Sequence, residues 1–155
     1  MKLVRTRQEL TEIVTQWHKD GETIGLVPTM GSLHEGHLTL VRALDGKATR
    51  RIVTIFVNPI QFNNPDDFQL YPRGLEADEA LLAETGVVDV LYAPDETQIF
   101  PPGFCTRISV SGPDRMLCGG DRPGHFDGVA TVVTKLFMQT RANIAAFGEK
   151  DFQQL

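Results

Sequence analysis

Two histidines three residues apart are the first candidates for chemistry in this sequence. His34 and His37 lie in VPTMGSLHEGHLTLV (residues 27–41), between two apolar runs. Imidazoles hydrogen-bond phosphate oxygens, and charged imidazoles would offset negative charge that develops at an α-phosphate during group transfer. Gly31 and Gly36 would let a ligand approach the backbone, and a helix that begins near Gly36 would direct free N–H groups toward the same place. The segment predicts a phosphate-binding turn between a strand and a helix.

Other uses of the histidine pair fit its spacing less well. A zinc-protease helix needs H-E-x-x-H, whereas this segment reads H-E-G-H, and no obvious third ligand follows. The segment also lacks the lysine of a Walker loop and the glycine spacing of GxGxxG. The pair could instead be structural, with both side chains capping a helix or lying on the surface. Phosphate chemistry is the favoured interpretation, and the structural role is its alternative.

Strands and helices alternate along the chain around this turn. Thr6 and Glu9 form a capping box for a helix that ends near Gly21. Helical periodicity predicts three more helices, at 36–47, 75–84 and 126–138. Apolar runs predict strands at 23–28, 51–57, 87–94 and 143–148. The remaining segments are expected to be a long loop at 58–73, a strand and turn within 106–115, and a flexible connection at 119–124.

This alternation is typical of an α/β domain, a Rossmann-like parallel sheet with helices on both faces. In such sheets ligands bind outside the carboxyl ends of the strands. Polar segments follow three of the predicted strands: PTMGSLHEGH (28–37), NPIQF (58–62) and GEKD (148–151). We expect these three segments to converge on one edge of the sheet.

Composition limits the class of protein. The 155 residues suit one domain, 1–155, and the net charge of −5 argues against nucleic acid or an anionic membrane as a partner. No apolar run is long enough for a membrane helix, and the N-terminus has no apolar signal core. Cys105 and Cys118 are isolated thiols, which fit a reducing cytoplasm. The chain is therefore expected to be cytoplasmic and to bind small molecules.

The pattern His34-x-x-His37 resembles the HxGH signature of the nucleotidyltransferase superfamily. Five segments, in matching order, resemble the pantothenate synthetase family: PTMGSLHEGH (28–37), VNPIQF (57–62), YPR (71–73), RPGHFDGV (122–129) and FGEKDFQQ (147–154). The resemblance implies a ligase that condenses pantoate with β-alanine. In that family ATP and pantoate form pantoyl-adenylate and pyrophosphate, and the amine of β-alanine then displaces AMP.

The resemblance also implies an ATP site made of two segments. Their residues are Met30, Gly31, Ser32, Leu33, His34, Glu35, Gly36 and His37, and then Gly148, Glu149, Lys150 and Asp151. The implied catalytic residues are His37, His34 and Lys150. His37 would assist the departure of pyrophosphate, and His34 and Lys150 would contact the phosphates. Gly148 would let the backbone approach the ribose, and Asp151 would accept a hydrogen bond from a ribose hydroxyl.

Further residues are implied for the other substrates. Gln61 matches a glutamine that binds pantoate and lies near β-alanine, and Gln154 matches a second pantoate-binding glutamine. His125 would line the same pocket. ATP chemistry implies Mg²⁺, with Asp78 as an outer-sphere partner, although the ligands of the metal are not identified. The full-length protein is expected to be a homodimer.

The family's chain continues into a second domain that closes over the site, so the C-terminal domain is expected to be missing here. DFQQL should begin a helix. We expect residues 1–155 to fold, to bind ATP weakly and to be catalytically incomplete alone. Two alternatives stay open: a non-catalytic nucleotide-binding module, and an adenylyltransferase for nicotinate mononucleotide or phosphopantetheine. The NPIQF and GEKDFQQ segments favour pantothenate synthetase over the second alternative.

Overall fold

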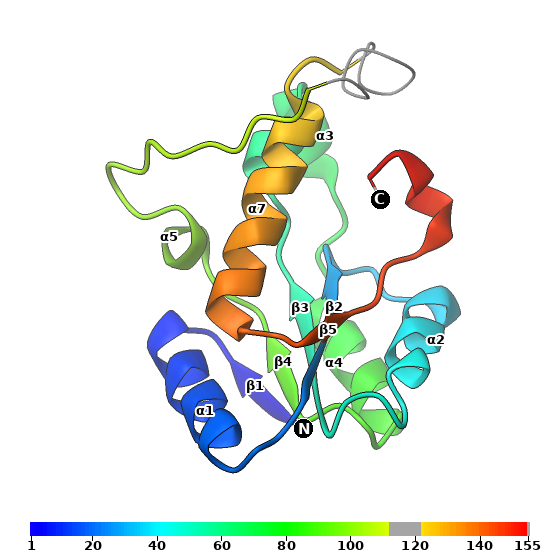
Figure 1. The fold of residues 1–155 in the computed structure, drawn as a ribbon. Helices are drawn as coiled ribbons and strands as arrows, with labels where there is room; N and C mark the ends of the chain where they lie inside the picture. Colours follow the sequence, from blue (N-terminus) through cyan, green and yellow to red (C-terminus); the bar gives the residue numbers. More distant parts are fainter. Residues whose placement is uncertain (112–121, 155) are drawn as a thin grey trace.

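A five-stranded parallel sheet forms the centre of the computed structural model, which describes residues 1–111 and 122–154 (Figure 1). The strands are β1 (Lys2–Val4), β2 (Ile24–Thr29), β3 (Arg50–Ile55), β4 (Val90–Tyr92) and β5 (Ile144–Ala145). Their order across the sheet is β1-β4-β3-β2-β5, and every pair of neighbours is parallel. The predicted α/β class with a parallel sheet is confirmed.

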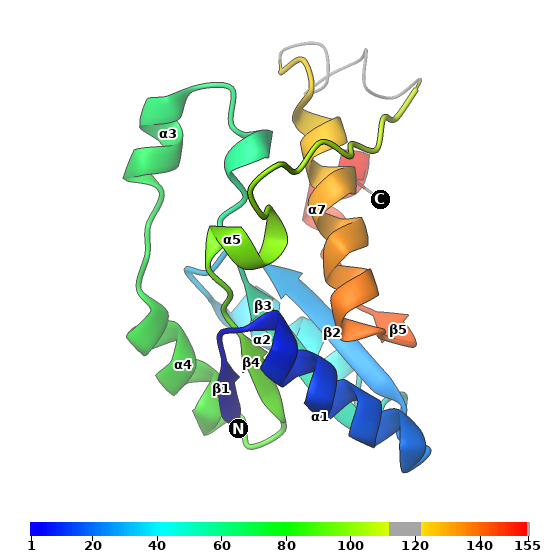
Figure 2. The same ribbon diagram turned by 90° about the vertical axis from the view of Figure 1, so that its left-hand side faces the viewer.

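Helices cover both faces of this sheet, as Figures 1 and 2 show. On one face lie α1 (Arg7–Lys19), the short α5 (Glu96–Ile99) and α7 (His125–Thr140), and on the other lie α2 (Glu35–Ala43) and α4 (Leu75–Glu84). Side chains alternate between the faces along each strand. The row of aligned strand residues that packs under α1 and α7 consists of Leu26, Ile52 and Val90. The next row packs under α2 and α4 and consists of Val27, Val53 and Leu91.

Local sequence signals explain where the main helices begin. Thr6 accepts a hydrogen bond from the N–H of Glu9, whose side chain reaches back to the N–H of Thr6, so the predicted capping box is present. Helix α4 has the bounds expected from periodicity, and α7 begins just after Gly124, which has φ +79°. Helix α2 ends at Ala43, earlier than expected, because turns follow from Leu44.

Several expectations for the less regular segments are wrong. The predicted loop at 58–73 contains the 3₁₀ helix η1 (Pro59–Gln61) and helix α3 (Pro65–Leu70), which Asn64 caps through a hydrogen bond from the N–H of Asp66. Strand β1 and helix α5 were not expected, and residues 151–154 lie in a 3₁₀ helix, η3 (Glu149–Gln154).

The strand predicted within 106–115 is also wrong, since residues 106–111 form none. Side chains of α7 bind this segment instead: the N–H of Ile108 donates to Thr131 and that of Val110 donates to Asp127, at 3.0 and 2.9 Å. The rest of that prediction, the first half of the connection at 119–124, and Cys118 lie outside the described residues.

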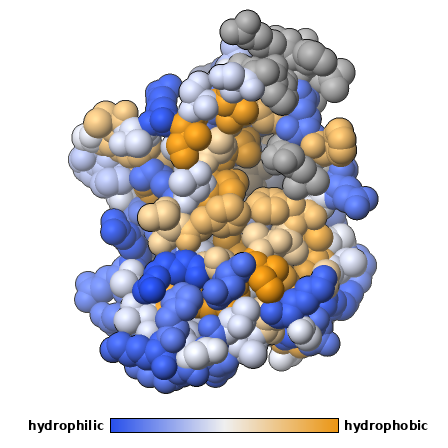
Figure 3. Space-filling view, viewed as in Figure 1, coloured by the Kyte–Doolittle hydropathy of each residue, from blue (hydrophilic) through white to orange (hydrophobic). Residues whose placement is uncertain are grey.

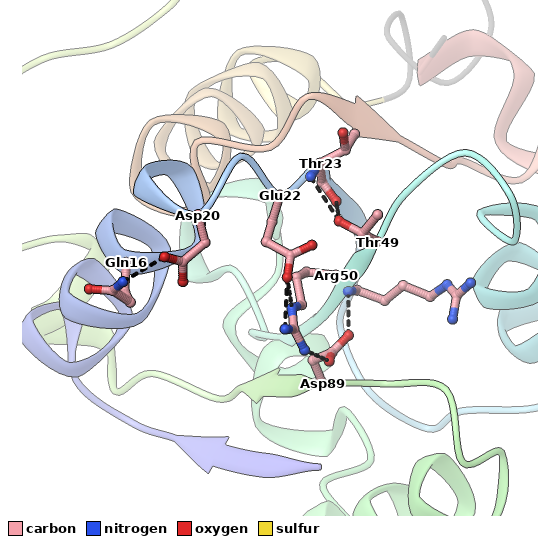
Figure 4. Close-up of polar contacts among 8 residues, drawn as sticks. Gln16, Asp20, Glu22, Thr23, Thr49, Arg50 and Asp89 are labelled. Carbon is pink, nitrogen blue, oxygen red and sulfur yellow. Dashed lines mark hydrogen bonds and ion pairs between the residues drawn. The ribbon is translucent and has the colours of Figure 1, made fainter.

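Polar contacts join the strands at their amino ends, opposite the edge considered below (Figure 4). The guanidinium of Arg50 donates to Glu22 at 2.8 Å and to Asp89 at 3.0 Å, and Asp89 also accepts from the N–H of Arg51 at 2.8 Å. Hydrogen bonds from Thr49 and Arg50 lower the pKa of Glu22. Because Arg50 begins β3, and Glu22 and Asp89 lie just before β2 and β4, these contacts join the starts of the three strands.

Candidate active site

A cavity of about 440 Å³ opens at the carboxyl ends of the central strands. The order of strands reverses at β2, which lies between β3 and β5, and ligands of parallel sheets bind at such a point. The three polar segments that follow these strands all contribute to the wall: residues of 28–37, Asn58 and Gln61, and Gly148 and Lys150. The expected convergence on one edge is therefore present in the structure.

Apolar side chains form the opposite wall of the cavity. Helix α7 contributes four of them: Val129, Val132, Val133 and Leu136. Figure 3 shows hydrophobic residues gathered over the middle of the face seen in Figure 1. Phe147 lines the cavity and packs edge to face against Phe137, with ring centroids 6.2 Å apart. The cavity thus has a polar side made of loops and an apolar side made of a helix.

His34 is the N-cap of α2. Its Nδ1 accepts a hydrogen bond from the N–H of Gly36 at 3.1 Å, and its own N–H donates to Nδ1 of His37 at 3.3 Å. The two rings lie with centroids 4.2 Å apart. Because Nδ1 of each ring accepts from a backbone N–H, Nε2 is the ring nitrogen that remains to donate. Both rings line the cavity, and they also play the capping role considered as an alternative.

Most of the N–H groups around the start of α2 are not free, in contrast to the expectation. The N–H of Gly31 donates to Thr29, and those of Ser32 and Leu33 donate to Asp78. The N–H groups of His34 and Gly36 donate to the histidine rings, and that of His37 donates to the carbonyl of His34. The histidine side chains replace solvent or ligand as partners of the first turn. These N–H groups are therefore already engaged within the protein.

Gly36 is required for this arrangement. A Cβ at this position would lie 2.8 Å from Cε1 and 3.0 Å from Nδ1 of His34, which is too close for the ring to stay where it caps the helix. Gly36 thus serves the histidine cap, a role that differs from the expected approach of a ligand to the backbone.

A chain of amide contacts fixes the polar corner of the cavity beside η1. Nδ2 of Asn58 donates to Oε1 of Gln61 at 2.9 Å and to the carbonyl of Gly128 at 3.1 Å, and Nε2 of Gln61 donates to Sδ of Met30 at 3.1 Å. Asn58 is 1% exposed, and its Oδ1 has no partner among the described residues. A buried acceptor without a partner needs a donor from a ligand or water. Sequence reasoning missed Asn58, although its place directly after a central strand was the available signal.

The start of α7 clamps η1 from the other side. His125 is 8% exposed, and its Nδ1 lies 2.8 Å from the carbonyl oxygen of Gln61. A Cβ on Gly128 would lie 2.6 Å from the carbonyl oxygen of Ile60, so only glycine allows this approach. His125 is not among the residues that line the cavity, which contradicts the expectation for it. It holds the backbone of Gln61 instead.

The second expected ATP segment lies at the mouth of the cavity. Gly148 and Lys150 line it, and Lys150 and Glu149 are exposed. Asp151 and Gln154 belong to η3, but their side chains lie outside what the structure describes. In the first segment, Leu33 and Glu35 do not line the cavity: Leu33 packs on the core under α2, and Glu35 pairs with Arg42.

Metal-binding and membrane-spanning features were not found in the part of the chain that the structure describes. In residues 1–111 and 122–154, no group of three or more His, Cys, Asp or Glu side chains could hold a metal ion. Asp78 has both carboxylate oxygens bound to backbone N–H groups, which accounts for its burial without a magnesium ion. Within the same ranges, no helix has the length and apolar character needed to cross a bilayer.

The parallel sheet, the paired histidines at the N-terminus of α2 and the cavity beside them define an α/β domain of the nucleotidyltransferase type. The sequence matches the family described as Pantoate-beta-alanine ligase over residues 2–155. Among curated proteins, it is 60% identical over 153 residues to the pantothenate synthetase of Roseobacter denitrificans and 58% identical to that of a Chelativorans species; each match covers 99% of this chain and 54% of the relative. The chain belongs to the pantoate–β-alanine ligase family and spans about half the length of these relatives.

Solved structures agree with this assignment. Pantothenate synthetase from Thermus thermophilus superposes with a TM-score of 0.92 at 46% identity, over 99% of this chain and 54% of that one. The ligase from Francisella tularensis, solved in complex with β,γ ATP and β-alanine, gives a TM-score of 0.94 at 43% identity, over 99% of this chain and 59% of its own.

Proposed function

We propose that this chain forms the ATP- and pantoate-binding part of an enzyme that joins pantoate to β-alanine. The observation that carries the proposal is that one cavity brings together the histidine pair, Lys150 and the Asn58–Gln61 corner. Family membership supports the reaction class, and the complex of the Francisella tularensis relative supports ATP and β-alanine as ligands. The polar loops would bind the nucleotide and the carboxylate, and the apolar wall of α7 would cover the methyl groups of pantoate.

The first step would transfer the adenylyl group of ATP to pantoate. A carboxylate oxygen of pantoate attacks the α-phosphorus, the bond to the β-phosphate oxygen breaks, and pyrophosphate leaves. His34 and His37 would stabilise the charge on the phosphates as donors through Nε2–H, because the backbone occupies Nδ1 of each ring. Lys150 would add a positive charge on the other side of the cavity. These residues position and stabilise the reacting groups without transferring a proton themselves.

The second step would use the polar corner. The amine of β-alanine attacks the acyl carbon of the adenylate, AMP leaves, and the amine loses a proton. Asn58 offers an acceptor, since its Nδ2 is already committed to Gln61 and Gly128, and Gln61 offers the Nε2–H that does not donate to Met30. Pantoate hydroxyls, which both donate and accept, match this pair, and an ammonium group matches the Asn58 acceptor. Gln154 would add a second amide for pantoate, and Gly148, Glu149 and Asp151 would lie along the ribose.

The metal and the cellular setting form part of the same proposal. The described residues provide no protein cage for Mg²⁺, so a magnesium ion would arrive with the triphosphate and would neutralise phosphate charge there. The isolated thiols Cys105 and Cys118 support a cytoplasmic location. We further propose a homodimer for the whole enzyme. Residues 1–155 alone would bind ATP weakly and turn over slowly, because His34 and Lys150 are exposed and water screens their interactions.

Exchange of labelled pyrophosphate into ATP tests the proposal. The assay uses an extended enzyme, in which residues 1–155 are continued by the remaining part of the Roseobacter denitrificans relative. Exchange that requires pantoate, and that neither nicotinate mononucleotide nor phosphopantetheine supports, is the expected result. Exchange with one of those two compounds would identify a different adenylyltransferase. ATP binding without exchange for any of the three would identify a non-catalytic nucleotide-binding module.

A further inference from the structure

Asp78 is a buried carboxylate on α4 that reaches the loop before α2, far from it in the sequence. It is 5% exposed and accepts hydrogen bonds from two successive backbone N–H groups of that loop. Oδ2 accepts from Ser32 at 2.9 Å and Oδ1 accepts from Leu33 at 2.7 Å, across 46 and 45 residues of sequence. Both bonds are short and charge-assisted, which places them among the stronger contacts of the loop.

The loop that Asp78 holds has an unfavourable backbone conformation. Gly31 has φ +86° and Ser32 has φ +52°, and the left-handed region is costly for a residue with a Cβ such as Ser32. Such conformations persist only where neighbouring contacts impose them. The contacts here are the two bonds to Asp78 and a third from the N–H of Gly31 to Oγ1 of Thr29 at 3.1 Å.

Asp78 contacts the loop from behind. It does not line the cavity that contains the histidines. It lines a separate cavity of about 300 Å³, which shares Met30, Gly31 and Phe56 with the first. In a trans peptide the N–H and the preceding C=O point in opposite directions. Since the N–H groups of Ser32 and Leu33 point to Asp78, the carbonyls of Gly31 and Ser32 point away from it.

We propose that Asp78 is a positioning residue for phosphate binding: it turns the N–H groups of the loop away from the nucleotide and sets where His34 begins α2. The proposal rests on the ATP site of the proposed function. Its consequence is that this loop binds phosphate through the imidazoles at its end, whereas a glycine-rich anion loop binds through backbone N–H groups.

The direction in which ATP affinity changes when Asp78 is replaced distinguishes this positioning role from an electrostatic one. A carboxylate behind the loop repels phosphate, so its removal would tighten ATP binding if charge were what mattered. Asp78→Asn keeps the size of the side chain but replaces one acceptor by a donor, which leaves one of the two N–H groups without a partner. If Asp78 acts through its hydrogen bonds, Asp78→Asn weakens ATP binding despite the lost repulsion.

Calorimetric titration of ATP and of adenosine into this chain tests the proposal. We expect Asp78→Asn to lose about tenfold or more in affinity for ATP and much less for adenosine, at a temperature where the variant is folded. Asp89→Asn is the matched control, because Asp89 also accepts from a backbone N–H and from a second donor, at the opposite end of the sheet. It should lower the melting temperature yet keep ATP affinity within about twofold. Ser32→Gly added to Asp78→Asn should recover part of the affinity, since glycine adopts the left-handed conformation without strain.

Unchanged or tighter ATP binding by folded Asp78→Asn would overturn the proposal, and so would an equal loss in Asp89→Asn. If Asp78→Asn does not fold, NMR of the unsubstituted chain decides. Couplings across the hydrogen bonds from Ser32 and Leu33 to the Asp78 carboxyl carbon should survive saturation with ATP, and their loss would show that phosphate takes these N–H groups. If the unsubstituted chain binds no ATP, the proposed function fails, and the couplings in the ligand-free chain still show whether Asp78 holds the loop.

Discussion

Replacing Gly128 by alanine tests how closely α7 must approach η1. The added Cβ would lie 2.6 Å from the carbonyl oxygen of Ile60, 2.9 Å from its carbon and 3.0 Å from Cα of Gln61. All three are backbone atoms, so no change of rotamer relieves the clash, and η1 must move away from α7. The shift would weaken two hydrogen bonds, from Asn58 to the carbonyl of Gly128 at 3.1 Å and between His125 and the carbonyl of Gln61 at 2.8 Å.

The expected loss of stability follows from these contacts. Two weakened hydrogen bonds cost about 2 kcal/mol together, overpacking adds about 1–3 kcal/mol, and alanine in a helix interior returns about 1 kcal/mol relative to glycine. Gly128→Ala should therefore lower the free energy of unfolding by about 2–4 kcal/mol. Because Gln61 moves with η1, pantoate-dependent pyrophosphate exchange by the extended enzyme should fall by about 10²-fold, with ATP affinity nearly unchanged.

Urea unfolding and pyrophosphate exchange measure both effects. Gly74→Ala is the control, because a Cβ at Gly74 would meet no atom within 4 Å. An unfolding free energy for Gly128→Ala within about 0.5 kcal/mol of the unsubstituted chain, together with normal exchange, would refute the claim that this contact positions Gln61.

Four further predictions address the site and the sheet. His37→Ala in the extended enzyme should lower pyrophosphate exchange by about 10²–10³-fold, and normal exchange would remove His37 from catalysis. Gln61→Ala should weaken pantoate binding by about 1–3 kcal/mol in a titration that leaves ATP affinity unchanged, and equal losses for both ligands would indicate misfolding. Burial raises the pKa of Tyr92 to about 12 from its ordinary value of 10.0, so the stability due to its protonated form is full below pH 10.0 and is lost as the pH rises toward 12. In urea unfolding, the free energy of unfolding of Tyr92→Phe should therefore fall less steeply with alkaline pH than that of the unsubstituted chain. An equally steep fall in the variant would show that other groups cause it. AMP release by residues 1–155 alone should be more than about tenfold slower than by the extended enzyme, since water screens the charges of an open site, and equal rates would contradict that reason.

The central sheet could be predicted from the sequence because its signals are local. The runs around Leu26, Ile52 and Leu91 are apolar on both faces of the sheet, as buried parallel strands require. The capping box of α1 and the periodicity of α4 place those helices directly. Strand β1 has only three residues, which is too few for a periodic signal, and α3 was missed although Asn64 followed by proline is a helix-start signal.

The candidate site was predictable in its location and less so in its contacts. Sequence order placed the segments of His34, Gln61 and Lys150 at the carboxyl ends of strands, and all three line one cavity. The roles of Asp78 and His125 depend on partners 45 and 64 residues away, which no spacing rule indicates. The N–H groups of α2 were expected to be free because the first turn of a helix leaves its N–H groups without partners in the helix. Histidine is not a usual N-cap residue, and the ring of His34 takes that position here.

The most direct measurement of the central claim is an NMR titration of this chain with ATP and with pantoate. Both ligands are proposed to bind in the cavity at the carboxyl ends of β2, β3 and β5. ATP should therefore shift the amide signals of His34, His37 and Lys150 most strongly, and pantoate should shift those of Asn58 and Gln61, with Met30 responding to both. Shifts from either ligand that cluster away from this cavity would contradict the account.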